Sequence, residues 1–304
     1  MSVPPSASAV AGLAMLVYGS DQVVDGATAL AHRLGVPTLF VGVTFVAVGS
    51  SIPEITSSLY AGFYGAGDFI VGHVVGSAVS QVTLGVGVVG LFYPLSMSDS
   101  DLDHYGGGML AAALAMLAAV WSGTVTRLEG AVMVAAYVAF LAVRYEDVAY
   151  EDHVDVEEDA SLPLAVAAGA LGLLLVVAGG HLLVANSREL AVQYGVPSYL
   201  VGFVTGLGTT APEIAIAALA VHRGEASIAT GTLFGSNITD PLFSLGVGAL
   251  VGGFTLADPR AAVVGVTYTV LVSALVVAVF AYQEELSRPA AAGCVLLYVP
   301  SLAV

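Results

Sequence analysis

The chain has 304 residues, of which 58% are hydrophobic and 10% are charged, and its net charge is −16. About a quarter of the residues in a soluble domain are charged, so this composition excludes an ordinary soluble protein and indicates a polytopic membrane protein. The apolar stretches are continuous and do not alternate with polar residues, which favours helices over a membrane β-barrel.

Ten apolar runs follow one another along the chain, and about 20 apolar residues suffice to span a bilayer as a helix. They lie near 9–30, 36–63, 69–93, 106–121, 125–144, 161–186, 196–221, 227–254, 260–282 and 289–304. The stretch 146–160 is strongly acidic and predicts a solvated linker. We therefore expect a first five-helix repeat at 1–145, an acidic linker at 146–160 and a second five-helix repeat at 161–304.

The two halves are related by an internal duplication. "LGVPTLFVG" at 34–42 matches "YGVPSYLVG" at 194–202, and "SSIPEI" at 50–55 matches "TTAPEI" at 209–214. Because each half has an odd number of spans, the second copy enters the membrane from the opposite side. The sequence thus predicts an all-α membrane protein of ten helices, built as two inverted repeats with broken helices at the midplane.

Each repeat places a proline and a glutamate inside an apolar run, as Pro53-Glu54 and Pro212-Glu213. We expect a first half-helix to end near Gly49 or Gly208, which would free the carbonyls of about Ala47 and Gly206 for a cation. An alternative is a capping box, in which Ser51 with Glu54 and Thr210 with Glu213 only satisfy the start of the next half-helix. A carboxylate at the centre of a membrane helix is costly, by at least about 2.5–3.5 kcal/mol, so a functional role is favoured.

A second polar pattern occurs on the following span of each repeat. His73, Ser77 and Gln81 are spaced by four residues and share a helix face, as do Thr232, Ser236 and Asp240. Small residues allow close approach of neighbouring helices; four glycines are placed for this, namely Gly72, Gly76, Gly231 and Gly235. Together the motifs predict a midplane cluster of Glu54, Glu213 and Asp240 ringed by hydroxyls. Such hard oxygen ligands suit Ca²⁺ or Na⁺.

These motifs, "GSSIPEI" with "GHVVGSAVSQV" and "GTTAPEI" with "GTLFGSNITDP", resemble the two alpha-repeats of the sodium/calcium exchanger family within the cation/calcium antiporters. The resemblance covers both repeats and implies Ca²⁺ efflux driven by Na⁺ entry, with gating helices around 9–30 and 161–186. It implies a central cation site at Glu54 and Glu213. The flanking Na⁺ sites that it implies involve Ala47, Ser50, Ser51, Ser77, Gly206, Thr209, Thr210, Ser236 and Asp240.

Three positions depart from the family pattern. Ala78 stands where its twin is Asn237, Gln81 stands where the family typically has Asn or Asp, and His73 stands where Asn is usual. Gln81 keeps an amide and so stays in the predicted site, with an extra methylene. His73 is read as a packed, hydrogen-bonded residue or as a proton-coupling group.

Other functions remain open at this point. Exchange of Ca²⁺ or another cation for H⁺ is the nearest alternative, because a buried carboxylate can carry a proton. A passive cation channel is a further one. "GAGD" at 65–68 also fits the GxGD pattern of intramembrane aspartyl proteases, with Asp68 as the catalytic residue, although the twin "GEAS" at 224–227 favours a polar turn.

We expect the chain to be a multi-pass protein of the cell membrane, and a transporter instead of an enzyme. Its partners are the transported Ca²⁺ and Na⁺, with H⁺ as the alternative, and the lipid bilayer. No cofactor, nucleic acid or obligatory protein partner is implied. The single cysteine, Cys294, excludes an intrachain disulfide.

Overall fold

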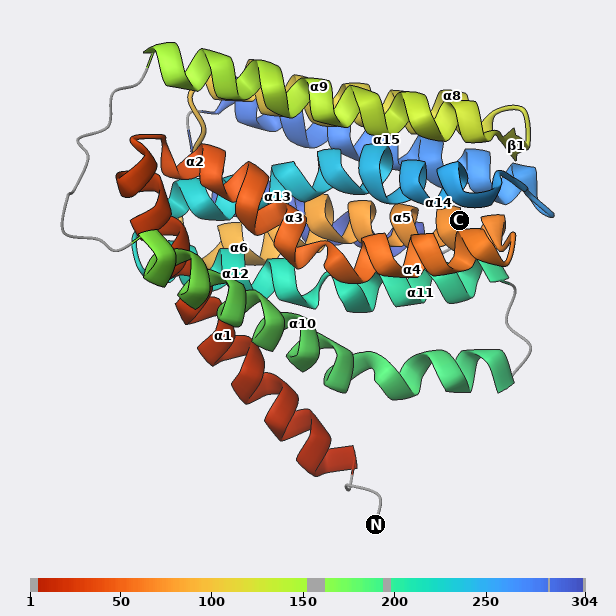
Figure 1. Cartoon of the computed structure of the whole chain (residues 1–304), viewed down its shortest axis with the longest axis horizontal. Helices are drawn as coiled ribbons and strands as arrows, with labels where there is room; N and C mark the ends of the chain where they lie inside the picture. The colour runs from red at the N-terminus through yellow and green to blue at the C-terminus, as the bar shows by residue number, and fades with distance from the viewer. Residues whose placement is uncertain (1–4, 152–161, 194–197, 284, 303–304) are drawn as a thin grey trace.

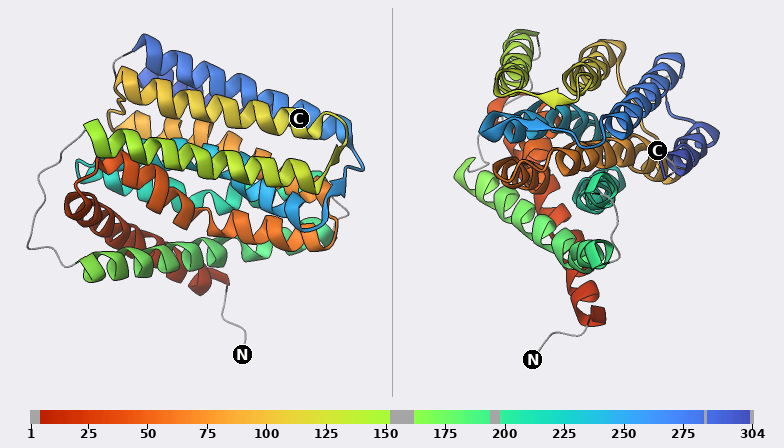
Figure 2. Two further views of the ribbon diagram at one scale, coloured as in Figure 1. Left: turned by 45° about the horizontal axis from the view of Figure 1, so that its top comes forward. Right: turned by 90° about the vertical axis from the view of Figure 1, so that its right-hand side faces the viewer.

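The computed structural model describes residues 5–151, 162–193, 198–283 and 285–302. These residues form helices, most of which lie side by side along the long axis of the molecule, while α1 crosses them obliquely (Figure 1). The two long helices α1 and α10 pack against each other along one side of the bundle, and α8 and α9 lie on the opposite side (Figures 1 and 2).

The helical segments follow the chain order that the apolar runs predict. In the first half they are α1 (Pro5–Leu34), α2 to α4 (Thr38–Val41, Ala47–Ser50 and Ile52–Phe63), α5 and α6 (Gly67–Ser80 and Val86–Phe92), α7 and α8 (Asp99–Asp101 and Gly107–Val120), and α9 (Arg127–Glu151). In the second half they are α10 (Leu162–Gln193), α11 and α12 (Ser198–Thr209 and Ala211–His222), α13 and α14 (Ala226–Thr239 and Leu245–Gly252), α15 (Pro259–Tyr282), and α16 and α17 (Arg288–Leu296 and Tyr298–Ser301).

Four π-helical turns join these helices into longer segments. They are η1 (Gly42–Val46), η2 (Gln81–Gly85), η3 (Leu102–Gly106) and η4 (Asp240–Ser244). The helix α9 continues to Glu151, into the predicted linker, and residues 152–161 lie outside the described residues.

Length and hydropathy identify four membrane-spanning candidates within the described residues. They are Gly67–Phe92, Arg127–Tyr145, Tyr199–His222 and Pro259–Tyr282, and the pair Thr38–Ser50 and Ile52–Phe63, bent by 47°, is a possible fifth. In the most apolar 18-residue stretch of Gly67–Phe92, 83% is buried inside the molecule, whereas only 22% of the corresponding stretch of Arg127–Tyr145 is buried. The polar motif on α5 therefore lies at the centre of the bundle, and α9 presents most of its apolar surface to the outside.

The two repeats pack against each other, and equivalent residues make equivalent contacts across the interface. A β-carbon on Gly72 of α5 would collide with the carbonyl oxygen of Tyr199 on α11, and one on Gly231 of α13 would lie 2.6 Å from the carbonyl oxygen of Leu39 on α2. Tyr199 is the repeat partner of Leu39, and Gly231 that of Gly72. Gly76 and Gly235 make equivalent close approaches to the other repeat. The prediction that these four glycines admit neighbouring backbones is confirmed.

Short strand pairings also reflect this symmetry. The strands β1 (Thr124–Val125) and β2 (Phe254–Thr255) are antiparallel, with Thr124 opposite Thr255. An isolated antiparallel bridge joins Ser96 to Glu285. Since α15 runs between Thr255 and Glu285, these two pairings tie the repeats together at opposite ends of the bundle.

Candidate functional site

Both proline–glutamate motifs interrupt a helix, but one or two residues later than predicted. The breaks fall at Ser51 and Thr210, between α3 and α4 and between α11 and α12, instead of at Gly49 and Gly208. A proline lacks an N–H and its ring crowds the carbonyl four residues earlier, but the N–H groups that precede it can still donate, so helical bonding persists almost up to the proline. The N–H of Ser51 still donates to Ala47 at 3.0 Å, and that of Thr210 donates to Gly206 at 3.1 Å.

The expectation that these breaks free the carbonyls of Ala47 and Gly206 is therefore wrong. Each carbonyl accepts the backbone N–H just described, and nearby hydroxyls approach both as well. Ser50 Oγ donates to the Ala47 carbonyl at 3.3 Å. The Gly206 carbonyl accepts from Thr209 Oγ1 at 3.1 Å and from Thr210 Oγ1 at 2.9 Å.

The capping-box alternative is also wrong. Ser51 and Thr210 occupy the N-cap positions of α4 and α12, yet neither side chain makes a capping hydrogen bond. The Thr210 hydroxyl instead lies 2.9 Å from the Gly206 carbonyl and 3.2 Å from Ser77 Oγ. Among the described residues the carboxylates of Glu54 and Glu213 accept no hydrogen bond of normal geometry, so satisfying the helix start does not explain these two glutamates.

The three predicted carboxylates are all buried, and they interact. Glu54, Glu213 and Asp240 are each 0% exposed. The charges of Glu213 and Asp240 act on Glu54, and that of Asp240 acts on Glu213. In the described part of the chain, none of the four carboxylate oxygens of Glu54 and Glu213 has a hydrogen-bond partner. The Thr209 hydroxyl approaches Glu54, and the Ser50 hydroxyl approaches Glu213, without a hydrogen bond of normal geometry.

Asp240 differs from the glutamates because several side chains donate to it. Ser77 Oγ donates to Oδ2 at 2.9 Å, and Gln81 Nε2 donates to the same oxygen at 3.2 Å and to Ser77 Oγ at 3.1 Å. Ser244 Oγ donates to Oδ1 at 3.3 Å. We call Glu54, Glu213, Asp240, Ser77 and Gln81 the carboxylate cluster, and both repeats contribute to it.

The remaining predicted site residues are buried or half-buried. Ser50, Ser51, Thr210 and Ser236 are 0% exposed, Ala47 and Gly206 are buried, and Thr209 is half-buried. The hydroxyls of Ser51 and Ser236 have no hydrogen-bond partner in the described structure. Ser244 was missed by the sequence reasoning, although its position four residues after Asp240 places it on the same helix face.

A π-helical turn begins at each of two equivalent site residues. The turn η2 starts at Gln81, and η4 starts at Asp240, its repeat partner. Such turns inside α-helices are frequent at functional sites. Here the same backbone irregularity occurs in both repeats beside the same polar position.

The chemistry of the cluster is that of mixed oxygen donors. No group of three or more His, Cys, Asp or Glu side chains in a metal-ligating arrangement occurs among the described residues. The unpaired oxygens belong instead to two carboxylates, hydroxyls and the Gln81 amide carbonyl. This set of ligands suits hard cations and lacks the soft ligands that favour transition metals.

Asp68, the residue of the protease alternative, has a structural role. Its Oδ2 accepts the backbone N–H of Ala257 at 2.9 Å, and its Oδ1 accepts that of Asp258 at 2.9 Å. The carboxylate therefore fastens the start of α5 to the loop before α15. This geometry explains Asp68 as a polar turn residue, as the comparison of the repeats suggests.

Asp21 and Asp25 on α1 form an exposed ion-pair group with Arg223. Arg223, which follows α12, contacts Asp25 Oδ1 at 2.6 Å and Asp21 Oδ1 at 3.3 Å on α1. The neighbouring His222 Nδ1 lies 2.8 Å from the hydroxyl of Tyr93 at the end of α6. The turn after α12 thus contacts both α1 and α6.

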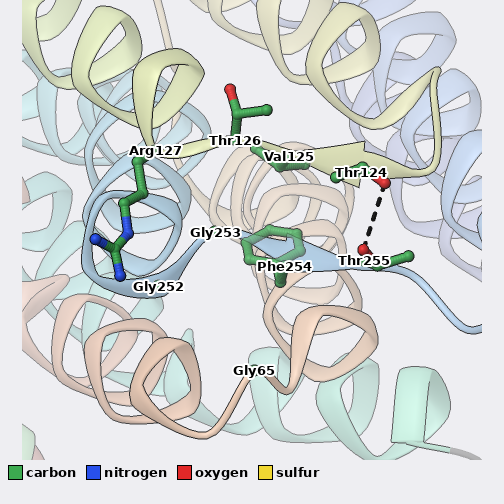
Figure 3. Close-up of a pocket in the computed structure, with 9 residues that line it drawn as sticks. All are labelled: Gly65, Thr124, Val125, Thr126, Arg127, Gly252, Gly253, Phe254 and Thr255. Carbon is green, nitrogen blue, oxygen red and sulfur yellow. Dashed lines mark hydrogen bonds between the residues drawn. The ribbon is translucent and has the colours of Figure 1, made fainter.

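An open cavity of about 550 Å³ lies away from these acids, at the ribbon formed by β1 and β2 (Figure 3). Arg127 is the single charged residue in its lining, and Thr124 Oγ1 lies 3.4 Å from Thr255 Oγ1 across the ribbon. None of the predicted site residues lines it, so it is distinct from the carboxylate cluster.

The fold and the buried polar cluster define a multi-pass membrane protein of the cation antiporter class. The sequence profile of the sodium/calcium exchanger protein family matches residues 6–146 and 164–304, so the chain belongs to this family. Proteins of this family are transporters, not enzymes, as expected. Cation/calcium antiport is therefore the general activity of the chain.

Individual relatives agree with this assignment. The putative antiporter CaxA of Alkalimonas amylolytica is 30% identical over 250 residues, 79% of this chain and 78% of CaxA. The sodium/calcium exchanger MaX1 of Methanosarcina acetivorans is 36% identical over 137 residues, 45% of this chain and 39% of MaX1. A structure of the sodium-calcium exchanger NCX_Mj, soaked with 10 mM Na⁺ and zero Ca²⁺, superposes with a TM-score of 0.82 at 24% identity and covers 98% of both chains. The predicted ten-helix inverted repeat fits this fold.

Proposed function

We propose that the protein is a secondary active antiporter that exchanges Ca²⁺ for Na⁺ by alternating access around the carboxylate cluster. The observation that carries this proposal is the pair of buried glutamates, Glu54 and Glu213, whose oxygens have no hydrogen-bond donors among the described residues. A buried charge is costly unless it is compensated. Bound cations supply that compensation. Because the two glutamates occupy equivalent positions in the repeats, the proposed cation site lies between the two repeats.

In this proposal Glu54 and Glu213 bind the central cation. The flanking Na⁺ sites use hydroxyls of Ser50, Ser51, Ser77, Thr209, Thr210 and Ser236, with Asp240, Gln81 and the carbonyls of Ala47 and Gly206. Because hydroxyls donate to those two carbonyls in this structure, binding there requires the hydroxyl protons to turn away.

Exchange follows from the electrostatics of the cluster. An empty site holds uncompensated buried charge, whereas a loaded site is close to neutral. We propose that the site can switch between the two sides of the membrane only when it is loaded. Movement of one cation in one direction then requires movement of another cation in return. The outer helices α1 and α10 are the elements that we propose to move against the rest of the bundle.

Exchange of Ca²⁺ for H⁺ is the second candidate. It is favoured by the same unpaired carboxylate oxygens, because a proton also neutralises a buried carboxylate. The two candidates differ in the ion that drives Ca²⁺ movement.

Tracer Ca²⁺ uptake into proteoliposomes under separate Na⁺, K⁺ and H⁺ gradients tests the proposal. We expect Ca²⁺ uptake to be driven by an outward Na⁺ gradient. This uptake should be lost in Glu54→Gln and in Glu213→Gln. Asp103→Asn removes an exposed carboxylate and serves as the control, with uptake unchanged. Uptake driven by H⁺ in Na⁺-free vesicles selects the second candidate. Undiminished uptake in both glutamate variants would overturn the site.

A further inference from the structure

His73 is a buried histidine that the proposed site does not use. It lies on α5, is 0% exposed, and its ring packs 5.6 Å from that of Phe69. Its Nε2 is 3.0 Å from Thr209 Oγ1 on α11 of the other repeat. The two helices touch closely here, because a β-carbon on Gly206 would collide with the carbonyl oxygen of His73. The close contact of the two backbones therefore holds α5 and α11 at a fixed separation where His73 meets Thr209.

The single hydroxyl proton of Thr209 determines the direction of this hydrogen bond. Thr209 Oγ1 lies 3.1 Å from the Gly206 carbonyl and beside the Glu54 carboxylate, and both of these groups are acceptors. With its proton directed at one of them, the hydroxyl can only accept from His73, so Nε2 carries the hydrogen and donates it. This leaves Thr209 one lone pair, on an oxygen that also lies beside Glu54.

The equivalent position in the other repeat lacks this arrangement. The partner of His73 is Thr232, whose hydroxyl donates to Ile228 of its own helix at 2.8 Å. The partner of Thr209 is Ser50, whose hydroxyl donates to Ala47 at 3.3 Å. Thr232 thus turns to its own backbone instead of across to Ser50, and the two halves of the site are not equivalent.

We infer that His73 is a positioning residue that fixes the Thr209 hydroxyl as a cation ligand and so sets the affinity for Na⁺ at this half of the site. The inference rests on the proposed function, because it takes Thr209 as a ligand. A monovalent ion gains less from carboxylates than a divalent ion does, so it depends more on correctly placed neutral oxygens. Loss of the donor should therefore weaken Na⁺ binding more than Ca²⁺ binding.

Two amide substitutions separate the positions of the two ring nitrogens. His73→Gln places an N–H group near the position of Nε2, whereas His73→Asn places one near Nδ1. His73→Phe keeps a ring without either donor. We expect the Asn and Phe variants to raise the Na⁺ concentration for half-maximal thermal stabilisation about fivefold, the equivalent of one hydrogen bond. The Gln variant should restore the wild-type value, and the Ca²⁺ value should change little in all three.

Thr232→Val is the matched control, because it removes a hydroxyl whose hydrogen bond in the described structure lies within its own helix, and it should leave the Na⁺ value unchanged. In a Thr209→Val background, the His73 substitutions should have no further effect on Na⁺. Equal behaviour of the Gln and Asn variants, or parallel changes for Na⁺ and Ca²⁺, would overturn the inference. These titrations measure binding, so their failure is distinct from an absence of Na⁺-driven Ca²⁺ uptake, which contradicts the proposed function instead.

Discussion

The buried acids of the cluster are surrounded unequally by hydrogen-bond donors. Asp240 accepts from Ser77, Gln81 and Ser244, whereas the oxygens of Glu54 and Glu213 have no hydrogen-bond partner among the described residues. A carboxylate that already accepts several bonds is held in place by the protein. The two glutamates have all their acceptor capacity available, so they are the groups whose energy changes most when a cation arrives.

This difference predicts a trade-off between stability and binding at Glu213. In cation-free buffer, at a pH high enough to ionise Glu213, Glu213→Gln should unfold at a higher temperature than the wild type, because the substitution removes an uncompensated buried charge. Ca²⁺ should stabilise the wild type, by about 2.7 kcal/mol at one hundred times the dissociation constant, and should stabilise the variant much less. Thermal unfolding in detergent with and without Ca²⁺ measures both effects. Equal stabilisation of the two proteins by Ca²⁺ would contradict the assigned role.

The sequence singles out the residues of the carboxylate cluster because the duplication shows each polar position twice. Glu54 and Glu213 stand out as carboxylates at matching places in apolar runs, and Asp240 stands out on the next span. The contact between His73 and Thr209 was not predictable, since it depends on how α5 and α11 are placed against each other. The reach of Gln81 to Asp240 depends on the same packing between repeats.

At the scale of elements, the apolar runs predict where the helices lie, but the proline motifs predict free carbonyls that the structure does not have. The carbonyls of Ala47 and Gly206 keep helical partners because the break at each motif is a single residue, Ser51 or Thr210. Sequence shows where a proline removes a donor. It does not show how the neighbouring backbone rearranges, and the π-helical turns at Gln81 and Asp240 were likewise not predicted.

The crossed packing of the repeats makes a prediction for two glycines. Gly72→Ala and Gly231→Ala each place a methyl group against a carbonyl oxygen of the other repeat, so each should destabilise the protein, by about 1–3 kcal/mol, as overpacking does. Gly107→Ala is the matched control, because a β-carbon there meets nothing within 4 Å. Alanine is a better helix former than glycine, so the control should be neutral or stabilising by up to about 1 kcal/mol. Thermal unfolding of the three variants compares them, and equal stability of all three would show that the close approach is not needed.

At the scale of the whole molecule, the two-fold relation is broken where α1 meets the rest of the bundle. Asp21 and Asp25 lie one helical turn apart on α1, and both contact Arg223. The repeat partner of Arg223 is Tyr64, whose hydroxyl lies 3.4 Å from that of Tyr60 on its own helix. One end of the molecule therefore has an ionic contact between an outer helix and the core, and the uncharged Tyr64 cannot form an ion pair at the equivalent position.

This asymmetry predicts an effect of Arg223 on rate and not on ion affinity. If α1 moves during exchange, its contact with Arg223 has to break, and an exposed ion pair contributes about 0–1 kcal/mol. Arg223→Gln should then raise the maximal rate of Ca²⁺ uptake, by up to about fivefold, since 1.36 kcal/mol corresponds to tenfold. The half-saturating Na⁺ and Ca²⁺ concentrations should stay the same, because Arg223 lies outside the carboxylate cluster. Arg260→Gln removes another exposed arginine and should change neither quantity.

A charge exchange tests the same contact. The double variant with Arg223→Asp and Asp25→Arg should return the rate towards the wild-type value. An unchanged rate in Arg223→Gln would show that this contact does not restrain α1.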